Sequence, residues 1–168
     1  MKRLVALWLA ATSLMGTGCA HVSQEMAANE ALVGAWKSQV QFKSGAFASI
    51  QDLEFMYVFN AGGTLTESSN YDGVPPVPPA YGIWRRIGPN RFEARYEFYA
   101  TKPPARLEEL TTGGGWQPAG RGVFIERIEM APDSQSYTST IRYSAFDAKG
   151  VPVEGGGEAN GRAMRSGF

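Results

Sequence analysis

Few residues in this sequence combine the side chains and the spacing that enzyme chemistry requires. The only histidine is His21 and the only cysteine is Cys19, and both precede the first predicted strand. A Ser-His or Cys-His catalytic pair and a zinc site built on imidazole are therefore excluded. The glycine-rich stretch at 112–116 lacks the Lys-Ser/Thr of a phosphate-binding loop. These residues predict no catalytic group, no metal site and no cofactor.

Two charged residues fall on the apolar faces of predicted strands. Glu126 falls on the same strand face as Phe124 and Ile128, and Arg85 falls on the same face as Ile83 and Ile87. Because every second residue of a strand faces the same side, both charged side chains are predicted to point inward. Because buried charges are costly unless they are paired, they would pair with each other, meet the polar group of a ligand, or reach solvent in another register. A general acid–base role for Glu126 would need a raised pKa in an apolar pocket.

The elements that would position these residues are nearly all strands. Alternation predicts strands at 33–42, 52–60, 64–69, 80–87, 91–99, 121–130, 136–146 and 156–165. No long crossover helix separates them, which favours an up-and-down antiparallel arrangement. We therefore expect an all-β fold, a single-domain eight-stranded barrel at 33–165, whose closure removes exposed strand edges.

Long and short connections alternate along this series. The long ones are 43–51, 70–79, 100–120 and 147–155, and the turns between them are short. In an up-and-down barrel alternate connections lie at opposite ends, so one end is closed by tight turns and the long loops surround a mouth at the other. Trp116 lies in the longest loop, either as a lid over the mouth or packed on the outside of the barrel.

The N-terminus is typical of an export signal. Lys2 and Arg3 precede an apolar run that ends near residue 15 and is too short for a permanent membrane helix. The approach to Cys19 resembles a bacterial lipoprotein signal, although Gly16 stands where that family prefers Leu. The resemblance implies removal of residues 1–18, lipidation of Cys19 and anchoring to the outer membrane facing the periplasm. Ordinary secretory cleavage after Ala20 is the alternative.

The remaining N-terminal and C-terminal segments are predicted to be a tether at 19–32 and a tail at 166–168. The chain carries 16 basic and 16 acidic residues. This balance argues against nucleic acid as a partner and against electrostatic docking on an anionic surface. Membrane association would come through Cys19. The predicted barrel contains no cysteine, so disulfides are excluded from it.

The first predicted strand opens with Gly34 and Trp36. A Gly-x-Trp on the first strand of an exported eight-stranded barrel resembles the lipocalins and the wider calycin group. The resemblance implies that Trp36 plugs the closed end and that a basic residue near the end of the last strand, Arg165 or Arg162, lies across it. The connection at 147–155 is too short for the helix that often follows the seventh strand in lipocalins, so the chain is expected to be lipocalin-like.

Many of the predicted inward positions are aromatic. An eight-stranded barrel is just wide enough to be filled by side chains or to hold one small ligand. The residues predicted to contact a ligand are Phe42, Leu53, Phe55, Tyr57, Tyr81, Arg85, Tyr96, Phe98, Trp116, Glu126 and Tyr143. We expect an envelope protein that binds a small apolar or aromatic molecule. A metal-independent isomerase or cyclase on the same scaffold and a purely structural envelope protein are the alternatives.

Overall fold

A computed structural model of the chain describes residues 31–71, 77–112 and 115–167. The predicted signal, the lipidation site Cys19 and nearly all of the predicted tether lie outside these described residues. Within them, no helix is long and apolar enough to cross a membrane.

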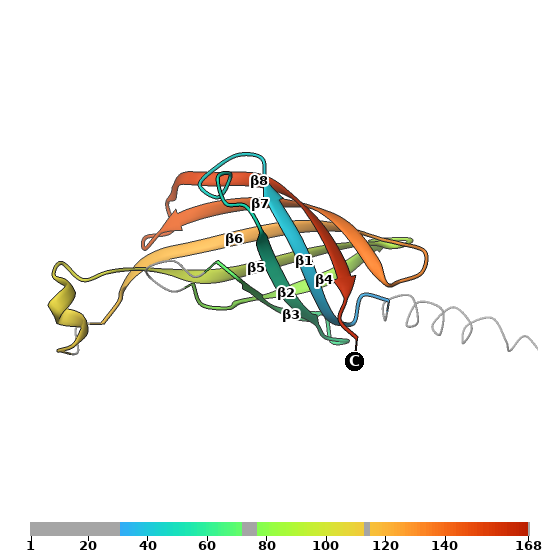
Figure 1. Cartoon of the computed structure of the whole chain (residues 1–168), viewed down its shortest axis with the longest axis horizontal. Helices are drawn as coiled ribbons and strands as arrows, with labels where there is room; N and C mark the ends of the chain where they lie inside the picture. Colours follow the sequence, from blue (N-terminus) through green and yellow to red (C-terminus); the bar gives the residue numbers. More distant parts are fainter. Residues whose placement is uncertain (1–30, 72–76, 113–114, 168) are drawn as a thin grey trace, which may run out of the picture.

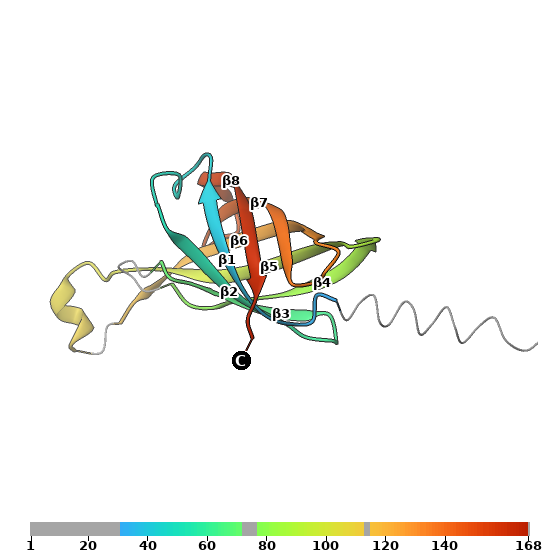
Figure 2. The ribbon, with the colours of Figure 1, turned by 45° about the vertical axis from the view of Figure 1, so that its right-hand side comes forward.

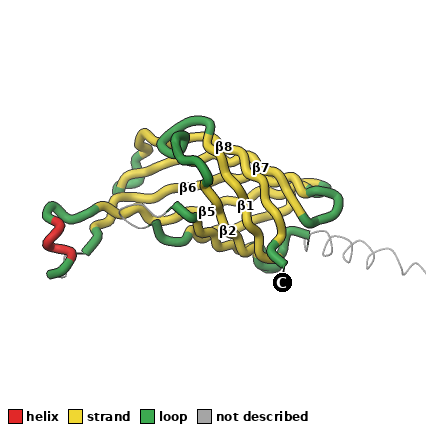
Figure 3. The backbone as a smooth tube through the Cα atoms, in the orientation of Figure 1, coloured by secondary structure: helices red, strands yellow, loops and turns green. Residues whose placement is uncertain are grey.

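The described residues form a closed antiparallel barrel (Figure 1). Its strands are β1 (Gly34–Phe42), β2 (Leu53–Phe59), β3 (Thr64–Ser69), β4 (Ala80–Gly88), β5 (Arg91–Lys102), β6 (Gln117–Met130), β7 (Ser136–Asp147) and β8 (Pro152–Arg165). Each strand pairs with the next, and β8 pairs with β1 from Trp36↔Arg165 to Phe42↔Ala159. Helical structure in this part of the chain is limited to η1 (Leu107–Leu110), which Figure 3 shows outside the barrel. The predicted all-β, single-domain, eight-stranded barrel is confirmed.

Three strands are longer than their alternation indicated. The β5–β6 ladder continues to Lys102↔Gln117, so this hairpin projects well beyond the barrel and carries η1 at its tip (Figures 1 and 2). Strand β8 begins at Pro152, which leaves a connection at 148–151 instead of the predicted long loop at 147–155. The Asp147 carboxylate closes this turn by accepting hydrogen bonds from the backbone N–H groups of Lys149 and Val151. Backbone pairing extends both hairpins where side-chain alternation is weak.

The closed end is built around Trp36, as the lipocalin resemblance implied. Its side chain is fully buried, and the indole N–H donates a hydrogen bond to the carbonyl of Leu32 at 2.9 Å. The guanidinium carbon of Arg165 lies 4.2 Å from the centre of the indole ring, a cation–π contact. The other candidate, Arg162, is exposed on the outer face of β8, so its predicted place at the closed end is wrong. Arg162 lies between the buried residues Gly161 and Ala163, so its side chain points to the opposite, outer face of the strand.

Arg165 also ties together the two ends of the described chain. Its guanidinium donates hydrogen bonds to the carbonyls of Ala31, Val33 and Ser134. Gly34 makes room for this side chain, because its φ is +131° and a Cβ atom there would lie 2.8 Å from an Arg165 nitrogen. Leu32 is fully buried. The barrel's packing therefore starts before residue 33, inside the segment predicted to be a tether.

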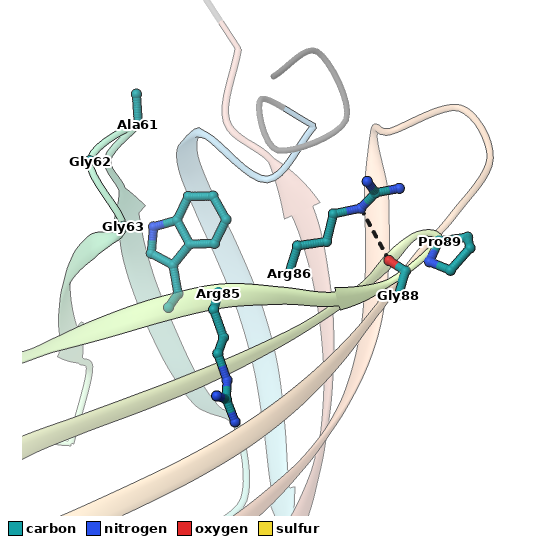
Figure 4. Close-up of a pocket in the computed structure, with 8 residues that line it drawn as sticks. Ala61, Gly62, Gly63, Arg85, Arg86, Gly88 and Pro89 are labelled. Carbon is teal, nitrogen blue, oxygen red and sulfur yellow. Dashed lines mark hydrogen bonds between the residues drawn. The ribbon is translucent and has the colours of Figure 1, made fainter. Parts of the chain in front are cut away.

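Strand β4 presents the opposite face from the predicted one. Ala80 and Trp84 are buried, whereas Tyr81 and Ile83 are each 64% exposed, and Arg85 is on the outer surface. Arg85 Nη2 donates to Glu93 Oε1 at 2.7 Å, so the predicted pair with Glu126 does not form. Figure 4 shows Arg85 and Arg86 leaving β4 on opposite sides.

The reason for this orientation of β4 lies on strand β5. Gly82 faces Tyr96, and a Cβ atom at residue 82 would overlap the Tyr96 side chain and the Arg95 carbonyl. Strands β4 and β5 approach each other too closely here for a side chain on the inner face of residue 82. Glycine therefore takes this position, Ala80 and Trp84 share its face, and Tyr81 and Ile83 lie outside.

Candidate functional site

A cavity of about 140 Å³ opens at the end of the barrel opposite Trp36. A single water occupies roughly 30 Å³, so the cavity has room for a larger molecule. Its walls are mainly aromatic and aliphatic, with one carboxylic acid; they are formed by Phe42, Phe47, Leu53, Phe55, Glu67, Ser69, Tyr71, Val77, Pro78, Phe98, Phe124 and Tyr143. They come from the ends of strands and from the connections β1–β2 and β3–β4, where the mouth was predicted.

Packing among rings shapes the mouth of this cavity. Phe47, in the β1–β2 connection, lies 5.2 Å from both Phe42 and Tyr143 between ring centres. The rings of Phe98 and Tyr143 are nearly parallel, 6.3 Å apart, and meet above Gly122 on β6. A Cβ atom at residue 122 would overlap both rings, so glycine at this position leaves room for them to pack against the β6 backbone.

Most of the residues predicted near the mouth line this cavity: Phe42, Leu53, Phe55, Phe98 and Tyr143. Tyr81 does not, because β4 turns it outward. Trp116 immediately precedes β6 in the hairpin that projects from the barrel, is half-buried, and is not part of the cavity wall. Arg85 is likewise outside. The ligand-binding role of the lining residues stays a prediction.

Glu67 is the one carboxylic acid in the described cavity wall, and sequence reasoning missed it. The other wall residues absent from the predicted ligand contacts are Phe47, Ser69, Tyr71, Val77, Pro78 and Phe124. Glu67 lies on β3 opposite Tyr57 of β2 and Ala80 of β4, and it is only 5% exposed. Within the described residues, its Oε1 atom is buried and has no hydrogen-bond partner. The signal was present in Leu65, Glu67 and Ser69, which share one face of the strand, but the polar composition of 64–69 hid that face.

A polar layer lies below the cavity. Glu126 is fully buried, and its Oε2 atom accepts a hydrogen bond from the Tyr96 hydroxyl at 3.0 Å. The hydroxyls of Tyr96 and Tyr57 are also 3.0 Å apart. The Ser139 hydroxyl is near enough to favour the charged form of Glu126, but it does not meet the carboxyl at hydrogen-bonding geometry.

Two rings separate this polar layer from the cavity. Phe124 stacks on Tyr96 at 5.0 Å between ring centres, and Phe55 contacts Tyr57 at 6.0 Å. Phe55 and Phe124 contact each other at 5.7 Å and also line the cavity. The predicted inward positions of Tyr57, Tyr96 and Glu126 are therefore confirmed, but these side chains lie beneath the cavity and do not line it.

Burial makes both acids hard to ionise. Desolvation, with a smaller contribution from the nearby Glu126 carboxyl, raises the pKa of Glu67 to about 8. Desolvation also raises the pKa of Glu126, and the nearby hydroxyls of Ser139, Tyr57 and Tyr96 offset this only in part. Among the described residues, no basic group contributes to either shift. Near neutral pH the empty cavity therefore contains a protonated Glu67.

A wider depression of about 640 Å³ lies outside the barrel, between the turn at 61–63 and the segment 84–89 (Figure 4). Arg86 crosses it and donates to the carbonyl of Gly88 at 3.1 Å. Its walls are turn backbone, buried Trp84 and side chains that are exposed or half-buried, and none of the buried polar atoms without a partner in the described chain lies there. The barrel cavity is the better candidate because it is less open to solvent and is lined by Glu67, which has such an atom.

Comparison with known proteins adds no assignment. No protein-family model matches the chain, and no curated protein matches it significantly. Among the described residues, no group of three or more His, Cys, Asp or Glu side chains is arranged to hold a metal ion.

Proposed function

We propose that this chain is an exported binding protein of the bacterial cell envelope that holds one small apolar or aromatic molecule in its barrel. The observation that carries the proposal is the cavity of about 140 Å³ with aromatic walls at the loop-bearing end. Apolar cavities of roughly 150 Å³ bind benzene, so a molecule with a single ring is the appropriate size. A long acyl chain does not fit, because Phe55 and Phe124 close the cavity toward the rest of the barrel.

The closed end supports a place for the chain beside the lipocalins and calycins. The features in favour are the eight-stranded antiparallel closure and the buried Trp36 with Arg165 stacked on its ring. This lipocalin-like relationship is part of the proposal. It agrees with small-molecule binding at the opposite, open end of the barrel.

Binding can be tested with a neutral one-ring probe, benzyl alcohol, by calorimetry, together with native mass spectrometry of the purified protein for a retained ligand. Two neighbouring serines on β3 provide matched variants. Ser69→Phe places a ring in the cavity, whereas Ser68→Phe places the same ring on the exposed face of the strand. We expect the wild type and Ser68→Phe to bind the probe and Ser69→Phe to lose it. No retained ligand and no binding to the wild type would refute the proposal.

The lipidation of Cys19 remains part of this proposal. Ala31 and Leu32 lie at the closed end beside Arg165, so an anchored tether would leave the barrel there. The mouth would then face away from the membrane and take its ligand from the aqueous side. The intact mass of the protein from a membrane fraction tests this. A mature chain beginning at His21 without acyl mass would contradict it.

A second candidate is a metal-independent isomerase or cyclase on the same barrel. The observation in its favour is Glu67, a carboxylic acid that lines the cavity and has its pKa raised to about 8. Such a group can act as a general acid near neutral pH. Glu126, the residue predicted for this role, is separated from the cavity by Phe55 and Phe124. A ligand recovered unchanged after long incubation would favour the binding protein.

A further inference from the structure

We propose that the natural ligand carries a cationic group, a protonated amine on a small aromatic or apolar body, and that the Glu67 carboxylate binds this group. The proposal rests on the proposed function, because it names the ligand class of the same cavity. Glu67 was not among the residues predicted from the sequence to contact a ligand.

Glu67 has an unmet hydrogen bond. The residue lines the cavity, and its buried Oε1 atom lacks a partner within the described residues, although the great majority of buried polar side-chain atoms have one. An apolar molecule would leave this atom as it is. A ligand with a donor at this point would satisfy it, and an ammonium group offers up to three N–H donors.

The charge of the barrel interior also favours a cation. The ionisable groups that act on Glu67 or respond to its charge are Glu126, Tyr57 and Tyr96. All of them are acids. Arg85, which was predicted to point inward and would have neutralised this region, is bound to Glu93 on the outer surface. An anionic ligand would therefore find no basic group among these ionisable groups to pair with, whereas a cation can pair with the Glu67 carboxylate once this group has released its proton.

The aromatic wall of the cavity favours a cation as well. The rings of Phe42, Phe55, Phe98, Phe124 and Tyr143 line the same cavity as Glu67. The negative face of an aromatic ring attracts a cation, and more strongly when both are shielded from water. A carboxylate surrounded by rings therefore favours an amine over a neutral hydroxyl of the same shape, which would only exchange one hydrogen bond with protonated Glu67.

This mode of binding is linked to a proton. Because burial and Glu126 raise the pKa of Glu67 to about 8, the carboxyl is protonated in the empty cavity near neutral pH. A bound ammonium group favours the ionised form, so the pKa falls and Glu67 releases its proton to solvent. Binding of an amine should therefore release about one proton near pH 6.5, whereas binding of a neutral molecule should release none.

The experiment compares three probes of one shape on the mature protein: benzylamine, benzyl alcohol and benzoate. Calorimetry at pH 6.5 in two buffers of different ionisation enthalpy measures affinity and proton release together. We expect benzylamine to bind about tenfold or more tightly than benzyl alcohol, with proton release, because it gains a charge-assisted hydrogen bond and cation–π contacts. Benzoate should bind most weakly.

Two variants complete the test. Glu67→Gln keeps the size of the side chain but not its charge, so we expect it to bind the alcohol as the wild type does and to lose the preference for the amine. Glu154→Gln, an exposed glutamate at the start of β8, should change nothing. Equal binding of amine and alcohol by the wild type, or a preference that survives in Glu67→Gln, would overturn this inference and leave the proposed function standing. Failure of all three probes to bind the wild type would overturn both.

Discussion

Glu67 and Glu126 are two carboxylic acids in an interior otherwise made mainly of aromatic, aliphatic and small side chains. Glu126 is stabilised by the hydroxyls of Tyr96 and Tyr57, which form a short hydrogen-bonded chain beneath the cavity. Each acid also has a buried Oε1 atom without a hydrogen-bond partner among the described residues, but only Glu67 lines the cavity. Such an atom destabilises the folded protein by about 1–3 kcal/mol, and for Glu67 a ligand in the cavity would offset this cost.

The raised pKa of Glu67 makes the stability of the empty barrel depend on pH. The carboxyl changes from its ordinary pKa of 4.5 to about 8 in the folded protein, which therefore keeps a proton that the unfolded chain releases. The stability contribution is complete below about pH 4.5 and is lost as the pH rises toward 8, at about 1.4 kcal/mol per pH unit for this group. Glu126, whose pKa is also raised, adds to the same trend.

Urea unfolding at several pH values between 5 and 8 measures this slope. We expect Glu67→Gln to flatten it and to be more stable than the wild type at the upper end, because a neutral amide does not have to take up a proton on folding or be desolvated as a charge. Glu154→Gln is the control on an exposed glutamate and should keep the wild-type slope. A Glu67→Gln slope equal to that of the wild type would show that Glu67 ionises freely in the folded barrel.

Strand β4 shows how a neighbouring strand decides which face turns inward. Its apolar residues Tyr81, Ile83 and Ile87 alternate as an inward face would, yet they are exposed. The inner positions are Ala80, Gly82 and Trp84, whose sizes match the space left by Tyr96, Phe92 and Phe59. Trp84 is fixed by its indole N–H, which donates to the Asn60 carbonyl at 3.0 Å.

Two adjacent substitutions on β4 test this assignment. Trp84→Ala should lower the free energy of unfolding by about 3–5 kcal/mol, as large truncations in a core do. Ile83→Thr, which keeps a β-branched side chain on the exposed face, should change it by less than about 0.5 kcal/mol. Chemical denaturation of both variants is sufficient. A larger effect at residue 83 than at residue 84 would mean that β4 has the opposite register.

The two ends of the barrel differ in structure. At one end Trp36, Leu32 and Arg165 form a sealed plug with every guanidinium nitrogen hydrogen-bonded to a carbonyl. At the other, rings surround a cavity, and the β5–β6 hairpin extends beyond it (Figures 1 and 2). Stability is therefore concentrated at the closed end, and ligand exchange is left to the open end.

A pair of tryptophan substitutions measures how much each end contributes to stability. Trp36→Ala removes a fully buried ring together with its contact to Arg165, so we expect a loss of about 3–5 kcal/mol in the free energy of unfolding. Trp116→Ala removes a half-buried ring from the projecting hairpin and should cost about 1 kcal/mol or less. Equal shifts of the thermal midpoint for the two variants would contradict the assigned closed and open ends.

The strand series, the barrel and its two ends could be predicted from the sequence, because they follow from local signals. Alternation along 91–99 and 121–130 places Tyr96 and Glu126 inside, and the pattern of loop lengths places Phe42, Leu53 and Phe98 near the mouth. These inferences need only the period of two and the rule that alternate turns lie at opposite ends.

The face of β4, the role of Glu67 and the length of the β5–β6 hairpin depend on contacts between distant segments. Which side of β4 turns inward is set by the close approach of Gly82 to Arg95 and Tyr96 on β5, and hydrophobicity alone favours the other side. Glu67 becomes buried because β3 is held between β2 and β4 in a closed barrel, although its own segment is polar. Backbone pairing, which carries no side-chain signature, continues the β5–β6 ladder. The cavity is what remains once all of these rings are packed, so only the assembled barrel places a carboxylic acid in its wall.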